Sequence, residues 1–182
     1  MRIEMRIVIA SDIHGSAFYC EKLVRAIRAE NAQTLLLLGD TLDGENYDEV
    51  AEMLNDLCAE IRILSVRGNC DSEWDQRLLQ FPIMSEYSWL LVNDRMIFAT
   101  HGHDKLLKPK LLPGDIFLQG HTHVPSWEYR DGRYYFNPGS VSLPRRGSKN
   151  SYMLLNDDGF VWKDLSGNIY NTFYMPSSLS LS

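Results

Sequence analysis

The chain has 182 residues, of which 18 are Lys or Arg and 24 are Asp or Glu, so its formal net charge is −6 at neutral pH. This length predicts a single domain over residues 1–182, able to bury about two-thirds of its unfolded surface without disulfides. The 45% hydrophobic and 23% charged content excludes a disordered chain, and the acidic total argues against a protein that coats polyanions.

Cysteine usage and the chain ends indicate a compartment. Cys20, Cys58 and Cys70 are widely spaced and form no C-x-x-C pair, which favours reduced thiols and a cytoplasmic location. No apolar run approaches the roughly 20 residues of a membrane span, and the N-terminus lacks a signal-peptide core. We therefore expect no membrane association, and we expect a frayed tail over residues 176–182.

The first third of the chain alternates between two kinds of segment. Residues 6–10, 35–38 and 61–66 are short apolar runs of the buried-strand type. Residues 16–31 and 47–60 carry apolar side chains at helical spacing. The order strand, helix, strand, helix, strand predicts a parallel sheet with helical crossovers.

The rest of the chain is rich in predicted strands. Turn residues separate paired strands in three predicted hairpins, 87–92 with 95–100, 127–130 with 133–136, and 151–155 with 160–165. A further short strand is expected over 115–119. We expect this half to be antiparallel and the fold class to be α/β, with two mixed β-sheets packed face to face and helices outside.

Five predicted strands end in Gly-containing turns that carry potential metal ligands. These turns are Asp12-Ile13-His14, Gly39-Asp40, Gly68-Asn69, His101-Gly102-His103 and Gly120-His121-Thr122-His123. The C-terminal ends of parallel strands form the functional crevice of an α/β sheet. Side chains two apart on an extended segment point the same way, so Asp12 with His14, and His121 with His123, can each aim two ligands at one spot.

Each of these residues also has an ordinary structural interpretation. A single Asp12 or Asp40 is more often a turn or helix-cap carboxylate, and Asn69 after glycine is usual in turns. A lone histidine is more often a hydrogen-bonded surface or core residue. All five histidines of the chain, however, lie in three of the five turns. This coincidence favours a metal site.

The donor types indicate which metals fit. Imidazole, carboxylate and amide oxygen suit divalent transition metals, with manganese as the first expectation and iron, zinc, cobalt or nickel as alternatives, whereas calcium prefers all-oxygen ligands. Seven ligands exceed the four of a tetrahedral zinc site and fit two ions that share a carboxylate. Two-metal sites typically serve in-line displacement at phosphorus.

The ordered set of motifs resembles the calcineurin-like metallophosphoesterase superfamily. The short length and three runs further resemble its small bacterial and archaeal phosphodiesterases, the YfcE-like group: Gly68-Asn69-Cys70-Asp71, Thr100-His101-Gly102-His103 and Asn137-Pro138-Gly139-Ser140. The resemblance implies a two-sheet sandwich flanked by helices. It also implies metal-dependent hydrolysis of a small phosphate ester, more often a diester than a monoester.

The same resemblance implies which residues hold the metals. One ion would be bound by Asp12, His14, Asp40 and His123, and the second by Asp40, Asn69, His101 and His121. Asp40 would bridge the two ions, because a carboxylate offers two oxygens. A hydroxide bridging the ions would attack phosphorus.

One departure from the superfamily concerns the leaving-group acid. Much of the superfamily has histidine after Gly-Asn, where this chain has Cys70. The proton would come from His103, from Cys70 or from water, or no proton would be needed for a good leaving group. The structural alternatives are a packing role for Cys70 and an outer-shell role for His103. Asn69, His103 and Arg145 are the candidate substrate contacts, although a basic loop such as that of Arg145 is usually a solvated surface.

Two other functions are compatible with this fold. A non-catalytic scaffold would resemble the retromer subunit of the same fold, but that protein lacks part of the metal constellation that is complete here. A nuclease subunit is disfavoured by the acidic total, which leaves short oligonucleotides as the only expected nucleic-acid substrates. The family also suggests a homo-oligomer. The interface candidates are Trp127, Tyr129, Tyr134 and Tyr135, although such side chains are more often core residues.

Overall fold

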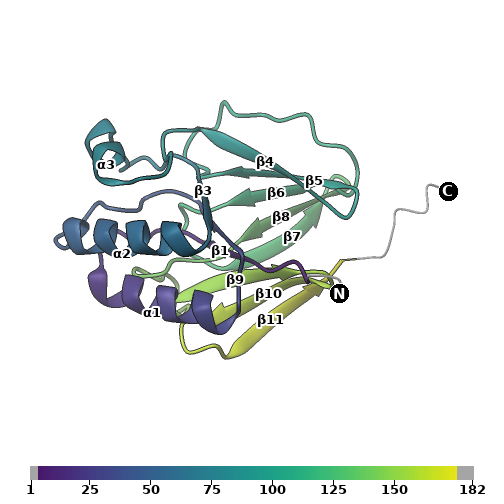
Figure 1. Ribbon diagram of the computed structural model, residues 1–182. Coiled ribbons are helices and arrows are strands. Elements are labelled where there is room, and N and C mark those ends of the chain that lie inside the picture. The colour runs from purple at the N-terminus through teal and green to yellow at the C-terminus, as the bar shows by residue number, and fades with distance from the viewer. Residues whose placement is uncertain (1–3, 176–182) are drawn as a thin grey trace.

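The computed structural model describes residues 4–175, which form three helices and eleven strands (Figure 1). The helices are α1 (Ala17–Ala29), α2 (Tyr47–Glu60) and α3 (Glu73–Leu78). The strands in chain order are β1 (Ile7–Ala10), β2 (Thr34–Leu37), β3 (Arg62–Ser65), β4 (Tyr87–Val92), β5 (Arg95–Thr100), β6 (Ile116–Gln119), β7 (Ser126–Arg130), β8 (Arg133–Asn137), β9 (Ser151–Asn156), β10 (Gly159–Asp164) and β11 (Ile169–Tyr174). The tail over residues 176–182, for which fraying is predicted, lies outside the described residues.

The strands form two mixed sheets, as the sequence predicts. The six-stranded sheet has the order β11-β10-β9-β1-β2-β3 and is parallel across β1, β2 and β3. The five-stranded sheet has the order β4-β5-β6-β8-β7. Its β5, β6 and β8 run parallel, so the expectation of a wholly antiparallel second half was wrong. Long connections, one of which contains β7, return the chain to the same end of the sheet before β6 and β8.

Two elements escaped the sequence analysis. Helix α3 has only six residues and no apolar periodicity, and it begins at a capping box in which Ser72 and Asp75 bond reciprocally. Strand β11 is an edge strand whose side chains are exposed or half-buried. Short or half-exposed elements leave little hydrophobic pattern in a sequence.

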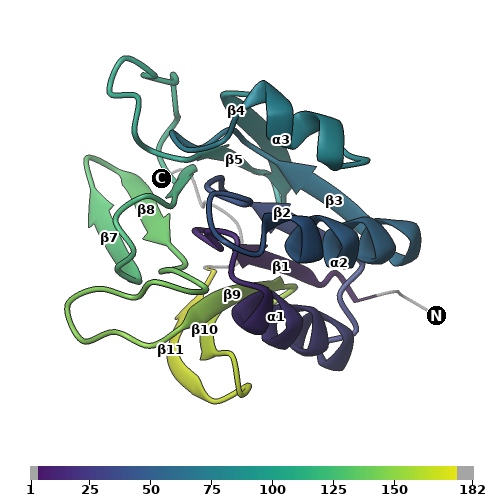
Figure 2. The ribbon, with the colours of Figure 1, turned by 90° about the vertical axis from the view of Figure 1, so that its left-hand side faces the viewer.

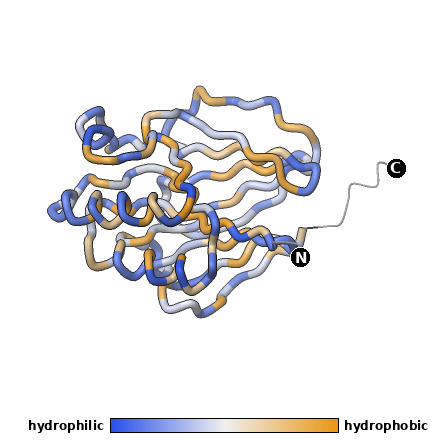
Figure 3. The backbone as a smooth tube through the Cα atoms, viewed as in Figure 1, coloured by the Kyte–Doolittle hydropathy of each residue, from blue (hydrophilic) through white to orange (hydrophobic). Residues whose placement is uncertain are grey.

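Apolar residues on the two faces of the six-stranded sheet build two separate cores. Helices α1 and α2 lie side by side on one face, while β7 and β8 of the other sheet lie on the opposite side (Figure 2). Along both helices hydrophobic and hydrophilic segments alternate, as expected for helices with one buried side (Figure 3). In β10, Phe160 and Trp162 face the second sheet and Val161 faces the helices, because successive strand residues point to opposite faces.

Trp162 of β10 connects the core between the two sheets to β8 of the five-stranded sheet. Its side chain is fully buried, and Nε1–H donates to the carbonyl oxygen of Asn137 at 2.8 Å. The Nδ2 of Asn137 in turn donates to Gly120 O at 2.8 Å, in one of the turns that carry candidate ligands.

No helix within residues 4–175 is long and apolar enough to cross a bilayer.

We expect Trp162→Phe to lower the free energy of unfolding by about 1–3 kcal/mol, because it removes a buried ring and leaves a buried carbonyl without its donor. Urea denaturation without added metal measures the change. The control is Trp89→Phe on β4, whose side chain is 41% exposed and which should change stability by less than about 0.5 kcal/mol. Equal effects of the two substitutions would contradict the role of Trp162.

Candidate metal centre

The loops that follow β1, β2, β3, β5 and β6 meet at one end of the sandwich. The β1 and β2 loops are joined by the amide of Asp12, which donates to Gly39 O at 3.1 Å, and by that of His14, which donates to Asp40 O at 3.0 Å. The β6 loop is joined to the β1 loop by the amide of His121, which donates to Asp12 Oδ2 at 3.2 Å. The five turns identified in the sequence are therefore neighbours in space.

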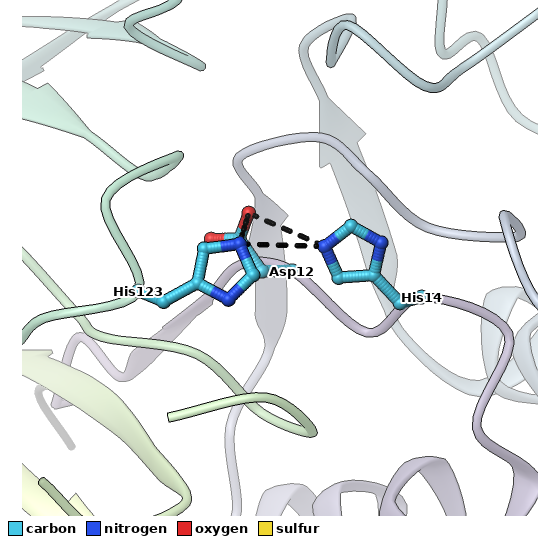
Figure 4. Close-up of side chains that lie close together, drawn as sticks. All are labelled: Asp12, His14 and His123. Atoms are coloured by element: carbon cyan, nitrogen blue, oxygen red, sulfur yellow. Dashed lines mark hydrogen bonds and ion pairs between the residues drawn. The ribbon is translucent and has the colours of Figure 1, made fainter. Parts of the chain in front are cut away.

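Asp12, His14 and His123 form the first cluster of donor atoms. His123 Nε2 lies 3.3 Å from Asp12 Oδ1 and 3.4 Å from His14 Nε2, and His14 Nε2 lies 3.9 Å from Asp12 Oδ1. Figure 4 shows the three side chains converging, two from the β1 loop and one from the β6 loop. Three donor atoms from two sheets thus face one small volume.

Asp40, His101 and His121 form the second cluster, with Asn69 beside it. His101 Nε2 lies 3.3 Å from Asp40 Oδ2, 3.2 Å from His121 Nδ1 and 3.1 Å from Asn69 Oδ1. All seven side chains expected as ligands are therefore found in the two clusters or against them.

Asp40 lies between the two clusters. Its Oδ2 is 3.8 Å from His14 Nε2 and 3.3 Å from His101 Nε2. Its Oδ1 accepts the amide proton of Cys70 at 2.8 Å. One oxygen of this carboxylate therefore faces both donor groups, while the other is held by the backbone.

Backbone carbonyls set the orientation of two imidazoles. His101 Nδ1 lies 2.6 Å from Leu38 O, and His123 Nδ1 lies 2.7 Å from Leu143 O. A carbonyl oxygen can only accept, so Nδ1 carries a proton in both rings, and Nε2 is the nitrogen that faces the cluster. Metal-binding histidines are typically held by this arrangement.

The donor set fits divalent transition-metal ions. Asp12 Oδ1 is buried and has no hydrogen-bond partner among the described residues, although a buried carboxylate oxygen normally has one. It lies instead against imidazole nitrogens, which bind a cation when they are neutral. Within residues 4–175, each cluster brings three donor atoms within 4.8 Å of one another.

The buried carboxylates and imidazoles of the two clusters shift one another's pKa values. Burial raises the pKa of Asp12, and the hydrogen bond from Ser11 and the nearby histidines offset this effect only in part. Burial also opposes ionisation of Asp40, but hydrogen bonds from His101 and from the amide of Cys70 lower its pKa to about 2. Burial would lower the pKa of His101, but its hydrogen bond to Asp40 and the charge of Asp40 raise it above its ordinary value.

The backbone at these ligands is unusual. Asp12, His14, Asp40, His121 and His123 all have φ between 48° and 65°, a left-handed region that non-glycine residues seldom adopt. Such conformations persist where the surrounding structure enforces them, and they are concentrated at functional sites. Five of the seven expected ligands share this feature.

Asp71 is a buried acid beside the site that the sequence analysis did not single out. It is 3% exposed, and its carboxylate accepts the amides of Asp40 at 2.9 Å, Thr41 at 2.9 Å and Gly68 at 2.7 Å. A Cβ on Gly68 would collide with the Asp40 side chain, so glycine permits this close approach. The only sequence signal for Asp71 was its place in the Gly-Asn-Cys-Asp run.

The remaining candidate residues surround the clusters. The ring centroid of His103 is 5.4 Å from that of His101, and its buried Nδ1 has no partner among the described residues. Burial, Asp43 and Asp40 raise the pKa of Cys70 to about 12, so this side chain is a neutral thiol. Arg145 is exposed, and its amide donates to His123 O at 3.1 Å.

Comparison with known protein families and sequences gave consistent matches. Residues 5–159 match the model of the calcineurin-like phosphoesterase superfamily domain. The chain is 41% identical over 167 residues to phosphodiesterase YfcE of Escherichia coli K12, covering 85% of this chain and 89% of that protein. It is 28% identical to the probable metallophosphoesterase YsnB of Bacillus subtilis, with 90% and 94% of the two chains covered.

Solved structures agree with the sequence matches. The E. coli phosphoesterase Yfce superposes with a TM-score of 0.87 at 36% identity, covering 94% of this chain and all (100%) of that one. Vacuolar protein sorting 29 of Cryptosporidium parvum superposes with a TM-score of 0.67 at 19% identity, covering 95% and 100%. A likeness at that identity demonstrates a shared fold alone.

We expect Asp71→Asn to weaken Mn²⁺ binding by about 10–100-fold, because the new amide group presents donors to backbone amides that need an acceptor. Isothermal titration calorimetry measures the affinity, and circular dichroism checks folding. Asp157→Asn in the exposed β9–β10 turn is the matched control. An unchanged affinity in folded Asp71→Asn would show that these three hydrogen bonds do not position the site.

Proposed function

This chain belongs to the calcineurin-like phosphoesterase superfamily, and on that premise we propose that it hydrolyses phosphodiesters at a site that holds two divalent ions. The family and the phosphoesterase class that the motifs predict are thereby confirmed. The observation that carries the proposal is the position of Asp40 Oδ2, which lies 3.8 Å from His14 Nε2 in the first cluster and 3.3 Å from His101 Nε2 in the second. The phosphodiesterase name of the E. coli relative supports the preference for diesters.

The protein residues would arrange the metals as follows. Asp12, His14, Asp40 and His123 would hold one ion, and Asp40, Asn69, His101 and His121 the other, with manganese as the first choice. When bound, such ions activate water and neutralise charge on phosphoryl oxygens. The oxygen of one water joins phosphorus, one ester P–O bond breaks, and a proton ends on the released alcohol.

His103 is the residue to which we assign proton delivery to the leaving group. It lies beside the second cluster, with its ring centroid 5.4 Å from that of His101 and 6.3 Å from that of His121, and the residue is half-buried rather than enclosed. The raised pKa of Cys70 makes this thiol a weaker candidate. Asn69 and Arg145 remain proposed substrate contacts, the latter at the exposed rim.

The scaffold alternative has weaker support. Vacuolar protein sorting 29 shares the fold of this chain at 19% identity, whereas the phosphodiesterase YfcE of E. coli is 41% identical to it over most of both chains. Function depends on the site rather than on the fold, and the donor atoms here converge. The single domain, the homo-oligomer and the cytoplasmic location remain predictions.

Asp40→Asn should lower the rate of bis(p-nitrophenyl) phosphate hydrolysis by at least about 100-fold at saturating Mn²⁺, because the shared oxygen loses its charge. Release of p-nitrophenolate measures the rate. Asp94→Asn in the exposed β4–β5 turn makes the same chemical change far from the site and should leave the rate unaltered. Full activity of Asp40→Asn would refute the two-ion proposal.

His103→Gln should slow hydrolysis of a methyl ester by about 100-fold and that of a p-nitrophenyl ester much less, because p-nitrophenolate departs without a proton. The comparison uses kcat for bis(p-nitrophenyl) phosphate and for dimethyl phosphate with the same Mn²⁺-loaded enzyme. An equal loss with both substrates would indicate that His103 positions other groups rather than donating the proton.

A further inference from the structure

A second concave feature adjoins the metal centre. A cavity of about 350 Å³ opens between the loop that joins β2 to α2 and the loop that joins β3 to α3. Its lining includes Asp43, Tyr47, Cys70, Trp74 and Asp75. The proposed hydrolysis requires no contribution from this pocket.

The pocket and the metal centre share a wall. Cys70 Sγ lies within 4.8 Å of donor atoms of His14 and Asp40. Asp43 Oδ2, in the same lining, is 3.4 Å from His14 Nδ1. A substituent attached to phosphorus at the metal centre therefore needs to extend only past Cys70 to enter the pocket.

Two large aromatic side chains stand in this pocket with much of their surface in solvent. Trp74 is 60% exposed and Tyr47 is 43% exposed. The capping box that begins α3, in which Asp75 N donates to Ser72 Oγ at 3.3 Å and Asp75 Oδ2 accepts from Ser72 N at 2.7 Å, fixes the turn that carries Trp74. The aromatic surface is thus held by ordered backbone.

The charge of the pocket selects among substituents. Asp43 and Asp75 contribute carboxylates, and none of the described residues that line the pocket is Lys, Arg or His. An anionic substituent such as a second phosphate would be repelled. Aromatic faces combined with carboxylates are the combination that binds organic cations, because the ring quadrupole and the carboxylates both attract positive charge.

We propose that this pocket, formed by Tyr47, Trp74, Asp43, Asp75 and Cys70, binds the alkylammonium substituent of a phosphodiester whose phosphate lies at the metal centre. The substrate class is a diester of a positively charged amino alcohol. The inference rests on the proposed phosphodiesterase function, and it adds the choice of substrate to that function.

The test compares two substrates of one shape. They are p-nitrophenyl phosphorylcholine and p-nitrophenyl 3,3-dimethylbutyl phosphate, in which carbon replaces the charged nitrogen. We expect kcat/KM to be about 3- to 30-fold higher for the choline ester, a fold-change that corresponds to the usual range of cation–π interaction energies. Trp74→Leu should bring the ratio close to one.

Trp89→Leu on β4 is the matched control, since this exposed tryptophan lies outside the pocket and its substitution should preserve the ratio. Tyr47→Leu serves as a second variant if Trp74→Leu does not fold. A native ratio of one or below, or a ratio that survives both pocket substitutions, would overturn the proposal.

A binding measurement separates this inference from the proposed function. Phosphocholine and 3,3-dimethylbutyl phosphate are titrated into the Mn²⁺-loaded protein by calorimetry, and the choline compound should bind more tightly. If neither diester is hydrolysed, the phosphodiesterase proposal fails, and the two affinities still decide the pocket. Equal affinities would overturn the pocket whatever the hydrolysis result.

Discussion

The buried carboxylate of Asp40 is the feature on which the rest of the site depends. It is 2% exposed, yet hydrogen bonds from His101 and from the amide of Cys70 hold its pKa at about 2, against the effect of burial. Its backbone amide is held by Asp71, a third buried acid beside Asp12 and Asp40. So much negative charge in one place is expensive without cations, and imidazoles alone compensate it incompletely.

The two sheets must pack together for the buried carboxylates of one sheet to lie beside the histidines of the other. Asp12, His14, Asp40 and Asn69 follow strands of the six-stranded sheet, whereas His101, His121 and His123 follow strands of the five-stranded sheet. The path from Trp162 through Asn137 to Gly120 O links the core between the sheets to the turn that carries His121. Packing and site geometry are therefore coupled.

The same architecture carries different surroundings in different proteins. The fold is shared with vacuolar protein sorting 29 at low identity, so it alone says little about chemistry. The convergent donor atoms are what this chain shares with phosphoesterases, and the loops beside them form the surroundings that differ from one protein to another. In particular, α3 places Trp74 over a pocket next to Cys70, at the position where much of the superfamily has histidine.

The sequence by itself predicted the order of most elements, the three hairpins and the turns that carry the candidate ligands, because apolar periodicity and turn residues are local signals. It did not reveal α3, the parallel arrangement of β5, β6 and β8, or the role of Asp71. Spacing also suggested that His121 and His123 would face one spot. The structure instead places His121 with Asp40 and His123 with Asp12, which is the division that the family resemblance implied, and both residues have positive φ. Only tertiary contacts can impose such a backbone, so the directions of these side chains were decided by packing.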